Sequence, residues 1–262
     1  TIVGLCIWQP TIVVGSTPHL LAPIAAWIVA RLRRVPFVLE VRDLWPEVLV
    51  EMGQLRAHSL LYRILEDAAS WVAARADAII VLAPGVATAL VERGADRDHV
   101  HLVSNGADLV PPPTDRTSAR AALGVGPDEV LIVYAGAHGP ANGLDLALDA
   151  AADLAVEHPE VRFVFVGDGP TKPALVERAE REHLPNVRFQ DACPKSAMPE
   201  VLGAADIGLH VLADVRLFTY GVSPNKVFDY LAAGLPVLTN VPGDVGELVT
   251  DNGAGLAVAP EA

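Results

Sequence analysis

The chain has 262 residues, 52% of them hydrophobic and only 5% aromatic, and its formal net charge at pH 7 is −13. This hydrophobic content is enough for two cores, and abundant Ala, Val and Leu with few aromatics favours α/β layers over a β-sandwich. The two cysteines, Cys6 and Cys193, are far apart and have no metal-ligand spacing. A reducing compartment is therefore predicted, and no metal is expected.

The charge is unevenly distributed along the chain. Residues 1–120 carry 11 Arg against 12 acidic residues, whereas residues 121–262 carry 8 basic against 20 acidic residues. Nucleic acid is excluded as an expected partner, because phosphate neutralisation needs a basic face. Arg31, Arg33 and Arg34 leave room for contact with an anionic membrane, although such a cluster is more often a solvated helix end. With no run of 18 apolar residues and no signal peptide, the expected location is cytoplasmic, including the inner face of the membrane.

In the first half, short apolar runs alternate with helical patterns. Residues 11–15 (TIVVG) form the first expected strand, and Ser16, Thr17 and Pro18 are expected to cap a helix that runs to about Arg34. The alternation predicts a parallel sheet with helices on both faces. Further strands are expected at 35–41, 77–82 and 100–103, and further helices at 57–74 and 85–93.

A linker signal separates this half from the next. Asn105 to Asp108 and three prolines at 111–113 precede a polar run that reaches Asp128. The predicted division is a partial amino-terminal domain at 1–110, a linker at 111–128 and a second α/β domain at 129–262. In the second domain, strands are expected at 129–135, 161–166, 187–189 and 207–211, and helices at 144–156, 174–182 and 198–204.

The segment 223–237, SPNKVFDYLAAGLPV, has the pattern of an anion-binding helix start. Ser223 is a candidate N-cap, Pro224 suits the first turn, and Asn225 completes a polar, amide-rich entry. Lys226 and Asp229 share a helix face at a spacing of three residues. Backbone N–H groups, a helix dipole and one cation suit a phosphate, and Asp229 can accept hydrogen bonds from a sugar diol. An ordinary capped surface helix is the equally weighted alternative.

Two loops follow buried strands. Residues 136–143 (GAHGPANG) offer Gly136 and Gly139 for close approach of the backbone to a ligand, with His138 as the loop's only candidate cation and Asn142 near its end. A simple left-handed turn is the alternative for these glycines. Gly167 opens a second strand-to-helix turn, but the full dinucleotide fingerprint of glycines is absent.

Arg42 and Asp43 follow the strand at 35–41. Charged groups at the carboxyl end of a buried parallel strand lie where open α/β sheets bind ligands. An Arg–Asp pair that only satisfies the strand end carries comparable weight.

The segment 223–237 resembles the signature of family 4 retaining nucleotide-sugar glycosyltransferases. Asp229 stands at the position of the family's second acidic residue, and Leu231 to Val237 continue the match, whereas Gly221 replaces the first acidic residue. The block at 223–230 (SPNKVFDY) is similar to the bacterial branch that builds surface polysaccharides and deoxyamino-sugar antigens. The resemblance implies two Rossmann-like domains facing each other across a cleft. By that comparison the amino-terminal domain lacks its first third and the closing helices are missing, so a fragment is expected.

The same resemblance implies the roles of the candidate residues. Lys226 and backbone amides would bind the donor diphosphate, because the family's loop arginine is absent and Asn142 stands where its lysine is expected. Asp229 would bind the ribose, and the turn at Gly167 would lie beside the nucleotide. Arg42 and Asp43 take the place of a histidine near the reacting sugar. Arg42 cannot act as a base, since a guanidinium group stays protonated in proteins.

The expected activity is retaining transfer of a hexosyl or N-acetylhexosaminyl group. The donor is expected to be a nucleotide-diphosphate sugar, with UDP as the first choice, and the acceptor lipid-linked or a saccharide. No cofactor is expected, and the reaction is expected to be metal-independent. A nucleotide-sugar epimerase of the same architecture and a non-catalytic sugar-nucleotide-binding module are the alternatives.

Overall fold

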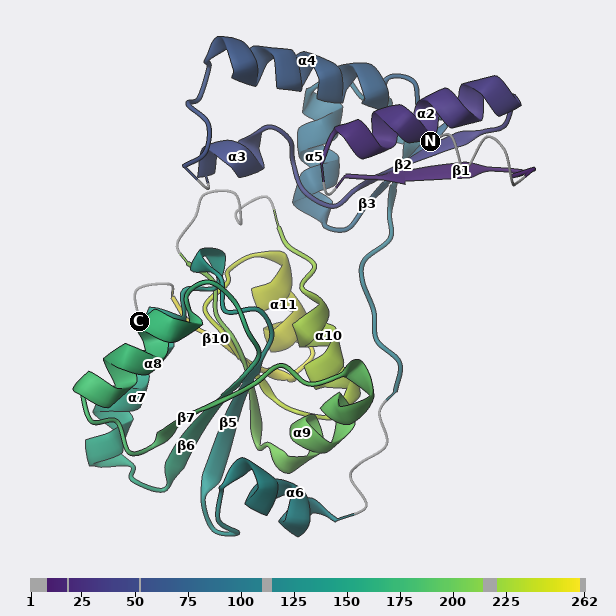
Figure 1. Cartoon of the computed structure of the whole chain (residues 1–262). Helices are drawn as coiled ribbons and strands as arrows, with labels where there is room; N and C mark the ends of the chain where they lie inside the picture. Colours follow the sequence, from purple (N-terminus) through teal and green to yellow (C-terminus); the bar gives the residue numbers. More distant parts are fainter. Residues whose placement is uncertain (1–8, 18, 52, 110–114, 214–220, 260–262) are drawn as a thin grey trace. The chain divides into compact units, whose positions relative to one another are not determined.

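The computed structural model describes residues 9–17, 19–51, 53–109, 115–213 and 221–259. The chain divides into two compact units (Figure 1). Unit 1 comprises Thr1–Ser104 and Arg216–Ser223, and unit 2 comprises Asn105–Val215 and Pro224–Ala262. Each unit is an α/β layer structure built on its own parallel sheet.

Unit 1 contains a four-stranded parallel sheet with the strand order β1-β2-β3-β4. The strands are parallel and follow one another in sequence order. Each is therefore connected to its neighbour by a crossover that contains a helix. The strands are β1 Val13–Ser16, β2 Phe37–Val41, β3 Ala78–Val81 and β4 Val100–Leu102. The helices are α2 Leu21–Arg33, α3 Glu47–Glu51, α4 Leu60–Ala73 and α5 Pro84–Glu92, and the 3₁₀ turn η1 spans Arg97–His99.

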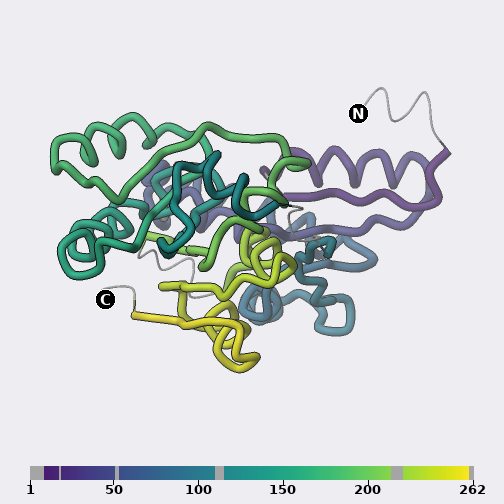
Figure 2. Tube along the Cα trace, turned by 90° about the horizontal axis from the view of Figure 1, so that it is seen from below, coloured from purple at the N-terminus to yellow at the C-terminus, as the bar shows by residue number. Residues whose placement is uncertain are grey.

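The core of unit 1 lies between its sheet and three helices. Phe37, Leu39 and Ile79 of the strands are buried together with Val72 of α4 and Val86 of α5. Helix α2 lies along β1, as the view from below shows (Figure 2). The almost uninterrupted apolar sequence of β2 is explained by this packing, because a parallel strand in such a sheet is covered on both faces.

Unit 2 contains a six-stranded parallel sheet with the strand order β10-β9-β8-β5-β6-β7. The order reverses between β5 and β8, as it does in Rossmann folds. The strands are β5 Val130–Ala135, β6 Val161–Val166, β7 Val187–Gln190, β8 Ile207–His210, β9 Val237–Thr239 and β10 Gly255–Ala257. The helices are α6 Arg116–Leu123, α7 Leu144–Glu157, α8 Lys172–Arg181, α9 Met198–Ala204, α10 Asn225–Ala232 and α11 Asp244–Asp251, with 3₁₀ turns η2 Pro140–Asn142 and η3 Lys195–Ala197.

The range predicted as a linker, 111–128, contains helix α6, which belongs to unit 2. Arg120 of α6 is buried, and its guanidinium donates to the carbonyl of Ala204 at 2.9 Å and to the carboxylate of Asp206 at 3.0 Å. Asp206 also accepts a hydrogen bond from the amide of Leu131 in β5. This polar segment is therefore ordered by a buried charged network, which composition alone does not reveal.

The capping role expected for Ser16 and Thr17 is wrong. Ser16 ends β1 and α2 begins only at Leu21, with no side-chain hydrogen bond at its N-cap; Pro18 lies outside the described residues. Thr17 is buried, and its hydroxyl accepts the backbone N–H of Arg42 at 3.0 Å. The residue thus joins the ends of β1 and β2 instead of starting a helix.

In the part of the chain that the structure describes, no helix is long and apolar enough to cross a bilayer. Arg31 and Arg33 lie in the last turn of α2. There, positive charge is favoured by the helix dipole.

Candidate functional site in unit 2

The candidate site lies in unit 2, where the strand order reverses. Ligands bind at such a switch point, outside the carboxyl ends of the strands. The ladder between β5 and β8 pairs Ile132 with Ile207 and Val133 with Gly208. Just beyond this ladder, Tyr230 of α10 bridges the strands: its hydroxyl accepts from the amide of Ala135 at 2.9 Å and donates to the carbonyl of Leu209 at 3.1 Å. A side chain therefore fills the gap where the two central strands diverge.

The loops that follow β5, β6 and β8 are held together by backbone contacts. The amide of Gly136 donates to the carbonyl of Val166 at 2.9 Å, and the amide of Ala213 donates to the carbonyl of Ala141 at 3.0 Å. A Cβ atom on Gly167 would lie 1.9 Å from the carbonyl oxygen of Gly136, so only glycine fits there. Glycine is thus required at position 167 by another loop; the placement of this turn beside the nucleotide stays a prediction.

Lys226 projects from α10 into this junction. Its Nζ donates to the hydroxyl of Tyr134 at 2.7 Å and to Oδ1 of Asn142 at 3.1 Å, and it lies 4.1 Å from the Tyr134 ring centroid. A Cβ atom on Gly136 would be 3.2 Å from the lysine Cε, so the glycine leaves room for this side chain. The structure thus brings together three of the predicted donor-binding residues, Gly136, Asn142 and Lys226.

The ammonium group of Lys226 is a desolvated cation, although the residue as a whole keeps part of its surface exposed. Burial lowers the pKa of Lys226 to about 7. Among the described residues no carboxylate lies within salt-bridge distance of its Nζ. Buried charges are normally paired, so this cation lacks the counter-ion that an anionic ligand would provide.

His138 does not supply a second cation, so that part of the sequence reading is wrong. Its side chain is fully buried, stacked on Tyr134 at a centroid distance of 5.8 Å and edge-on to Phe189 at 6.1 Å. Burial lowers its pKa, with a smaller contribution from Lys172, so the imidazole is neutral at pH 7. Both ring nitrogens lack a hydrogen-bond partner among the described residues. Its backbone instead connects the loops, since its amide donates to the carbonyl of Asp168 at 2.8 Å.

The start of α10 differs by one residue from the prediction. Pro224 occupies the N-cap position and Asn225, which is exposed, is the first helical residue, whereas Ser223 is grouped with unit 1. Asp229 is half-buried, and its carboxylate has no hydrogen-bond partner among the described residues. It is therefore available to a ligand. Gly139 is half-buried, and a Cβ there would meet only Asn142 at 3.5 Å, so this position does not require glycine.

Arg42 and Asp43 lie in unit 1, directly after β2, and both residues are exposed. They form no ion pair with each other, and the strand end is satisfied by Thr17. The carboxyl group of Asp43 is nevertheless crowded by protein atoms, and this desolvation raises its pKa despite the opposing charge of Arg42. The alternative reading, an Arg–Asp pair that closes the strand, does not describe this arrangement.

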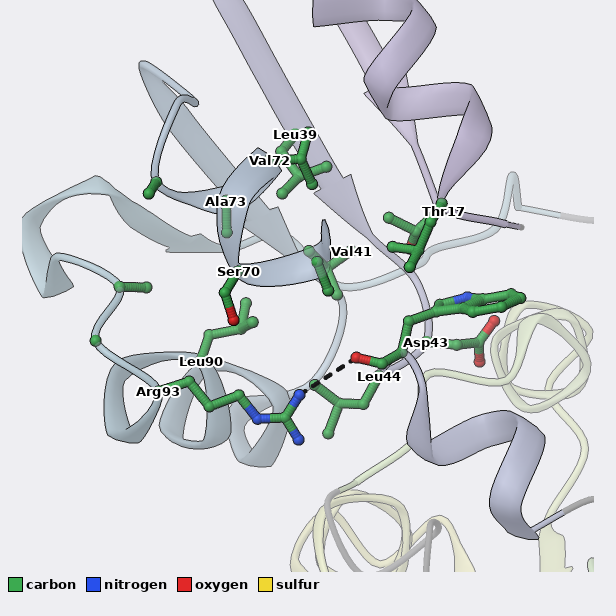
Figure 3. A pocket seen from close by; sticks show the side chains of 16 residues that line it. Thr17, Leu39, Val41, Asp43, Leu44, Ser70, Val72, Ala73, Leu90 and Arg93 are labelled. Atoms are coloured by element: carbon green, nitrogen blue, oxygen red, sulfur yellow. Dashed lines mark hydrogen bonds between the residues drawn. The ribbon is translucent and has the colours of Figure 1, made fainter. Parts of the chain in front are cut away.

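Asp43 also lines a cavity of about 200 Å³ in unit 1 (Figure 3). Its lining is mainly apolar and includes Val41 at the end of β2, Leu44 in the segment that follows and Val72 of α4. Arg93, the residue after α5, donates to the carbonyl of Trp45 at 3.4 Å, drawn as a dashed line, and pairs with Glu47 at 2.6 Å. Unit 1 therefore offers an apolar cavity bordered by charged groups.

Sequence reasoning missed Tyr134 and Tyr230. Tyr134 was read as one more strand residue of β5, although it is the direct partner of Lys226. Tyr230 follows Lys226 by four residues, so the two side chains share one face of α10. That spacing was the available signal.

His210, fully buried at the end of β8, was also not singled out in the sequence. Burial and the charge of Lys226 lower its pKa to about 3.

Among the described residues, no group of three or more His, Cys, Asp or Glu side chains could hold a metal ion.

These features define the class of the protein. Two Rossmann-like units, the second with a lysine at its switch point that no described carboxylate pairs with, correspond to the GT-B glycosyltransferase fold. The family described as glycosyl transferases group 1 matches residues 129–262, and the glycosyl transferase 4-like domain matches residues 7–106. The chain belongs to the glycosyl transferases group 1 family.

Individual relatives agree with this assignment. A D-inositol 3-phosphate glycosyltransferase of Nocardia farcinica is 34% identical over 198 residues, covering 71% of this chain and 42% of the relative. WcaI of Escherichia coli, a putative colanic acid biosynthesis glycosyl transferase, is 23% identical over 264 residues. This match covers 97% of this chain and 64% of the relative. The chain thus spans less than two thirds of these relatives.

Solved structures share the fold at low sequence identity. The crystal structure of HepE from Anabaena in complex with UDP and glucose has a TM-score of 0.74 and 21% identity, covering 94% of this chain and 64% of that chain. Sucrose-phosphate synthase from Thermosynechococcus elongatus has a TM-score of 0.72 and 19% identity, covering 98% of this chain and 62% of that chain.

Proposed function

We propose that this chain is part of a retaining glycosyltransferase that moves a sugar from a UDP-linked donor to a lipid-linked or saccharide acceptor. The observation that carries the proposal is Lys226, a buried ammonium without a counter-ion at the switch point of unit 2. A nucleoside diphosphate supplies the missing negative charge. The complex of HepE with UDP and glucose, although only a fold-level relative, supports UDP as the first nucleotide to test.

In the proposed reaction the protein stabilises the leaving diphosphate. Cleavage of the bond between the sugar and the diphosphate increases the negative charge on the phosphate oxygens. A preformed cation and backbone N–H groups at that position lower the barrier without rearranging during the reaction. Lys226 and the start of α10 would supply these groups, while Asp229, three residues further along the helix, would accept hydrogen bonds from the ribose.

We place the acceptor on unit 1, near Arg42 and Asp43. A raised pKa makes the Asp43 carboxylate a stronger base, which suits contact with an acceptor hydroxyl. The apolar cavity beside it suits a hydrophobic portion of the acceptor. An N-acetylated donor sugar and a role in surface polysaccharide synthesis remain proposals supported by the residues 223–230.

Contact with an anionic membrane is a separate part of the proposal. Arg31, Arg34 and Arg75 line one groove of unit 1 together with Trp27. Arginines beside an aromatic ring suit a headgroup region, where phosphates meet apolar groups. Sedimentation with vesicles that contain anionic lipid, compared with neutral vesicles, tests this part; equal sedimentation with both would remove it.

The decisive experiment combines binding and turnover. Calorimetric titration of the chain with UDP should show binding that a chelator does not change, since the site is proposed to act without a metal. Consumption of UDP-sugar by the full-length protein, with and without a membrane extract, then separates a transferase from a binding module. Binding without acceptor-dependent consumption would identify the module, and absence of binding would refute the donor site.

A further inference from the structure

The polar partners of Lys226 have a defined hydrogen-bond polarity. The hydroxyl of Tyr134 donates its proton to the carbonyl of Ala137 at 2.7 Å, so its oxygen is left to accept from the lysine Nζ at 2.7 Å. Oδ1 of Asn142 accepts a second hydrogen bond from Nζ at 3.1 Å. Both partners are therefore acceptors, and neither carries a negative charge.

A charged lysine has three N–H donors and no acceptor. Tyr134 and Asn142 use two of them, and no carboxylate among the described residues competes for the third. The flexible lysine stem is restrained as well, because the ammonium lies over the Tyr134 ring and the Cε lies against Gly136. The side chain is thus fixed with one donor unused.

We infer that Tyr134 and Asn142 are positioning residues that hold the Lys226 ammonium at the switch point of unit 2 and leave its third N–H for the donor diphosphate. This inference rests on the proposed function of unit 2. It assigns a purpose to two residues that do not themselves touch the ligand. Tyr134 is supplied by the central strand β5 and Asn142 by the turn η2, so the lysine is fixed against two elements outside its own helix.

The neighbouring titratable groups do not obscure a test that uses pH. His138, on the loop after β5, and His210, on β8, both have lowered pKa values because of burial, and Asp168 and Lys172 act on His138. Burial raises the pKa of Tyr134 and of Tyr230, so both hydroxyls stay protonated. Asp229, on α10 itself, is a further described group whose charge reaches this region, since it acts on Tyr230. The loss of a proton near neutral pH can therefore be followed on Lys226.

The test is UDP titration calorimetry of Tyr134→Phe across a range of pH. In the unchanged protein, affinity should fall above about pH 7 as Lys226 loses its proton; the terminal phosphate of UDP gains its own proton at about pH 6, equally for all variants. Tyr134→Phe keeps the ring but removes one acceptor from the ammonium. We expect about tenfold weaker binding, and we expect the fall to begin at a lower pH. Tyr62→Phe, which removes a buried hydroxyl bonded to Glu47 in unit 1, is the matched control and should leave affinity and pH profile unchanged.

Asn142 provides the second arm, because it lies on a surface turn and its replacement does not threaten the core. Asn142→Asp keeps the ammonium charged but pairs it with a carboxylate, so UDP affinity should fall even at low pH. Asn142→Ala should weaken binding less than Asn142→Asp. Tyr134→Phe and Asn142→Asp with unchanged affinity and pH profile would overturn the inference while leaving UDP binding intact. If the unchanged protein binds no UDP, or Lys226→Met binds it equally well, the proposed function itself fails.

Discussion

The ring of Tyr230 lies directly against Gly208: a Cβ atom added to the glycine would be 2.5 Å from two ring atoms. The ring can therefore pack against β8 only because position 208 has no side chain. The contact seats the tyrosine hydroxyl between β5 and β8, where it completes the hydrogen bonding of Ala135 and Leu209.

Gly208→Ala should lower the free energy of unfolding by about 1–3 kcal/mol, because it overpacks a fully buried contact. Urea denaturation measures this change. Gly106→Ala is the matched control, since a Cβ there meets nothing within 4 Å, and it should be close to neutral. If both substitutions have equal effects, the contact with Tyr230 does not restrain the strand.

Lys226→Ala should weaken UDP binding by about 1.5–3 kcal/mol, the range for a hydrogen bond to a charged group. Asp229→Asn should have a smaller effect, because a neutral amide can still accept one hydrogen bond from the ribose. Calorimetry on both variants checks the order. An unchanged affinity of Lys226→Ala would remove the basis of the donor site.

The same lysine should make stability depend on pH. Its pKa is about 7 in the folded protein, against 10.5 for an ordinary lysine. Between these values the unfolded chain binds the proton more tightly, so this group makes the free energy of unfolding rise with pH. Lys226→Met should therefore be more stable than the unchanged protein at pH 7 and below, and the difference should shrink towards pH 10. Denaturation at several pH values measures it; a constant difference would contradict the lowered pKa.

Arg42 and Asp43 should affect turnover more than donor binding, because the donor is proposed to bind to unit 2. In the full-length protein, Arg42→Lys and Asp43→Asn should leave UDP affinity nearly unchanged and reduce kcat. Arg42→Lys is informative, since it keeps the charge but loses the planar guanidinium. Melting temperature is measured alongside, and a large stability loss with normal turnover would assign the pair a structural role.

Much of the fold could be predicted because it depends on local patterns. Buried parallel strands such as β5 and β6 are continuous apolar runs, and their positions follow directly from the sequence. Helix α6 could not be found in this way, because Arg120 makes its buried contact with Asp206, which is 86 positions away in sequence. The sequence alone does not show whether a charged residue in a polar stretch forms hydrogen bonds with a distant residue or with water.

In the candidate site as well, the residues marked by a local pattern could be predicted and their distant partners could not. Lys226 and Asp229 stand out because helical spacing and neighbouring residues give them a common face. The partners of the lysine come from β5 and η2, and only the folded sheet brings Tyr134 and Asn142 to its Nζ. His138 was misread for the same reason, since its neutral state follows from burial against Tyr134 and Phe189.

The bridge made by Tyr230 has a mechanical consequence. Near the carboxyl ends of β5 and β8, the two strands are connected through the hydroxyl of a helix residue. A displacement of α10 must therefore either separate the two strands or break this bridge. The amide proton of Ala135 is consequently a reporter of α10: its exchange with solvent deuterium should accelerate whenever the helix detaches, and should slow when a ligand one turn away holds the helix in place.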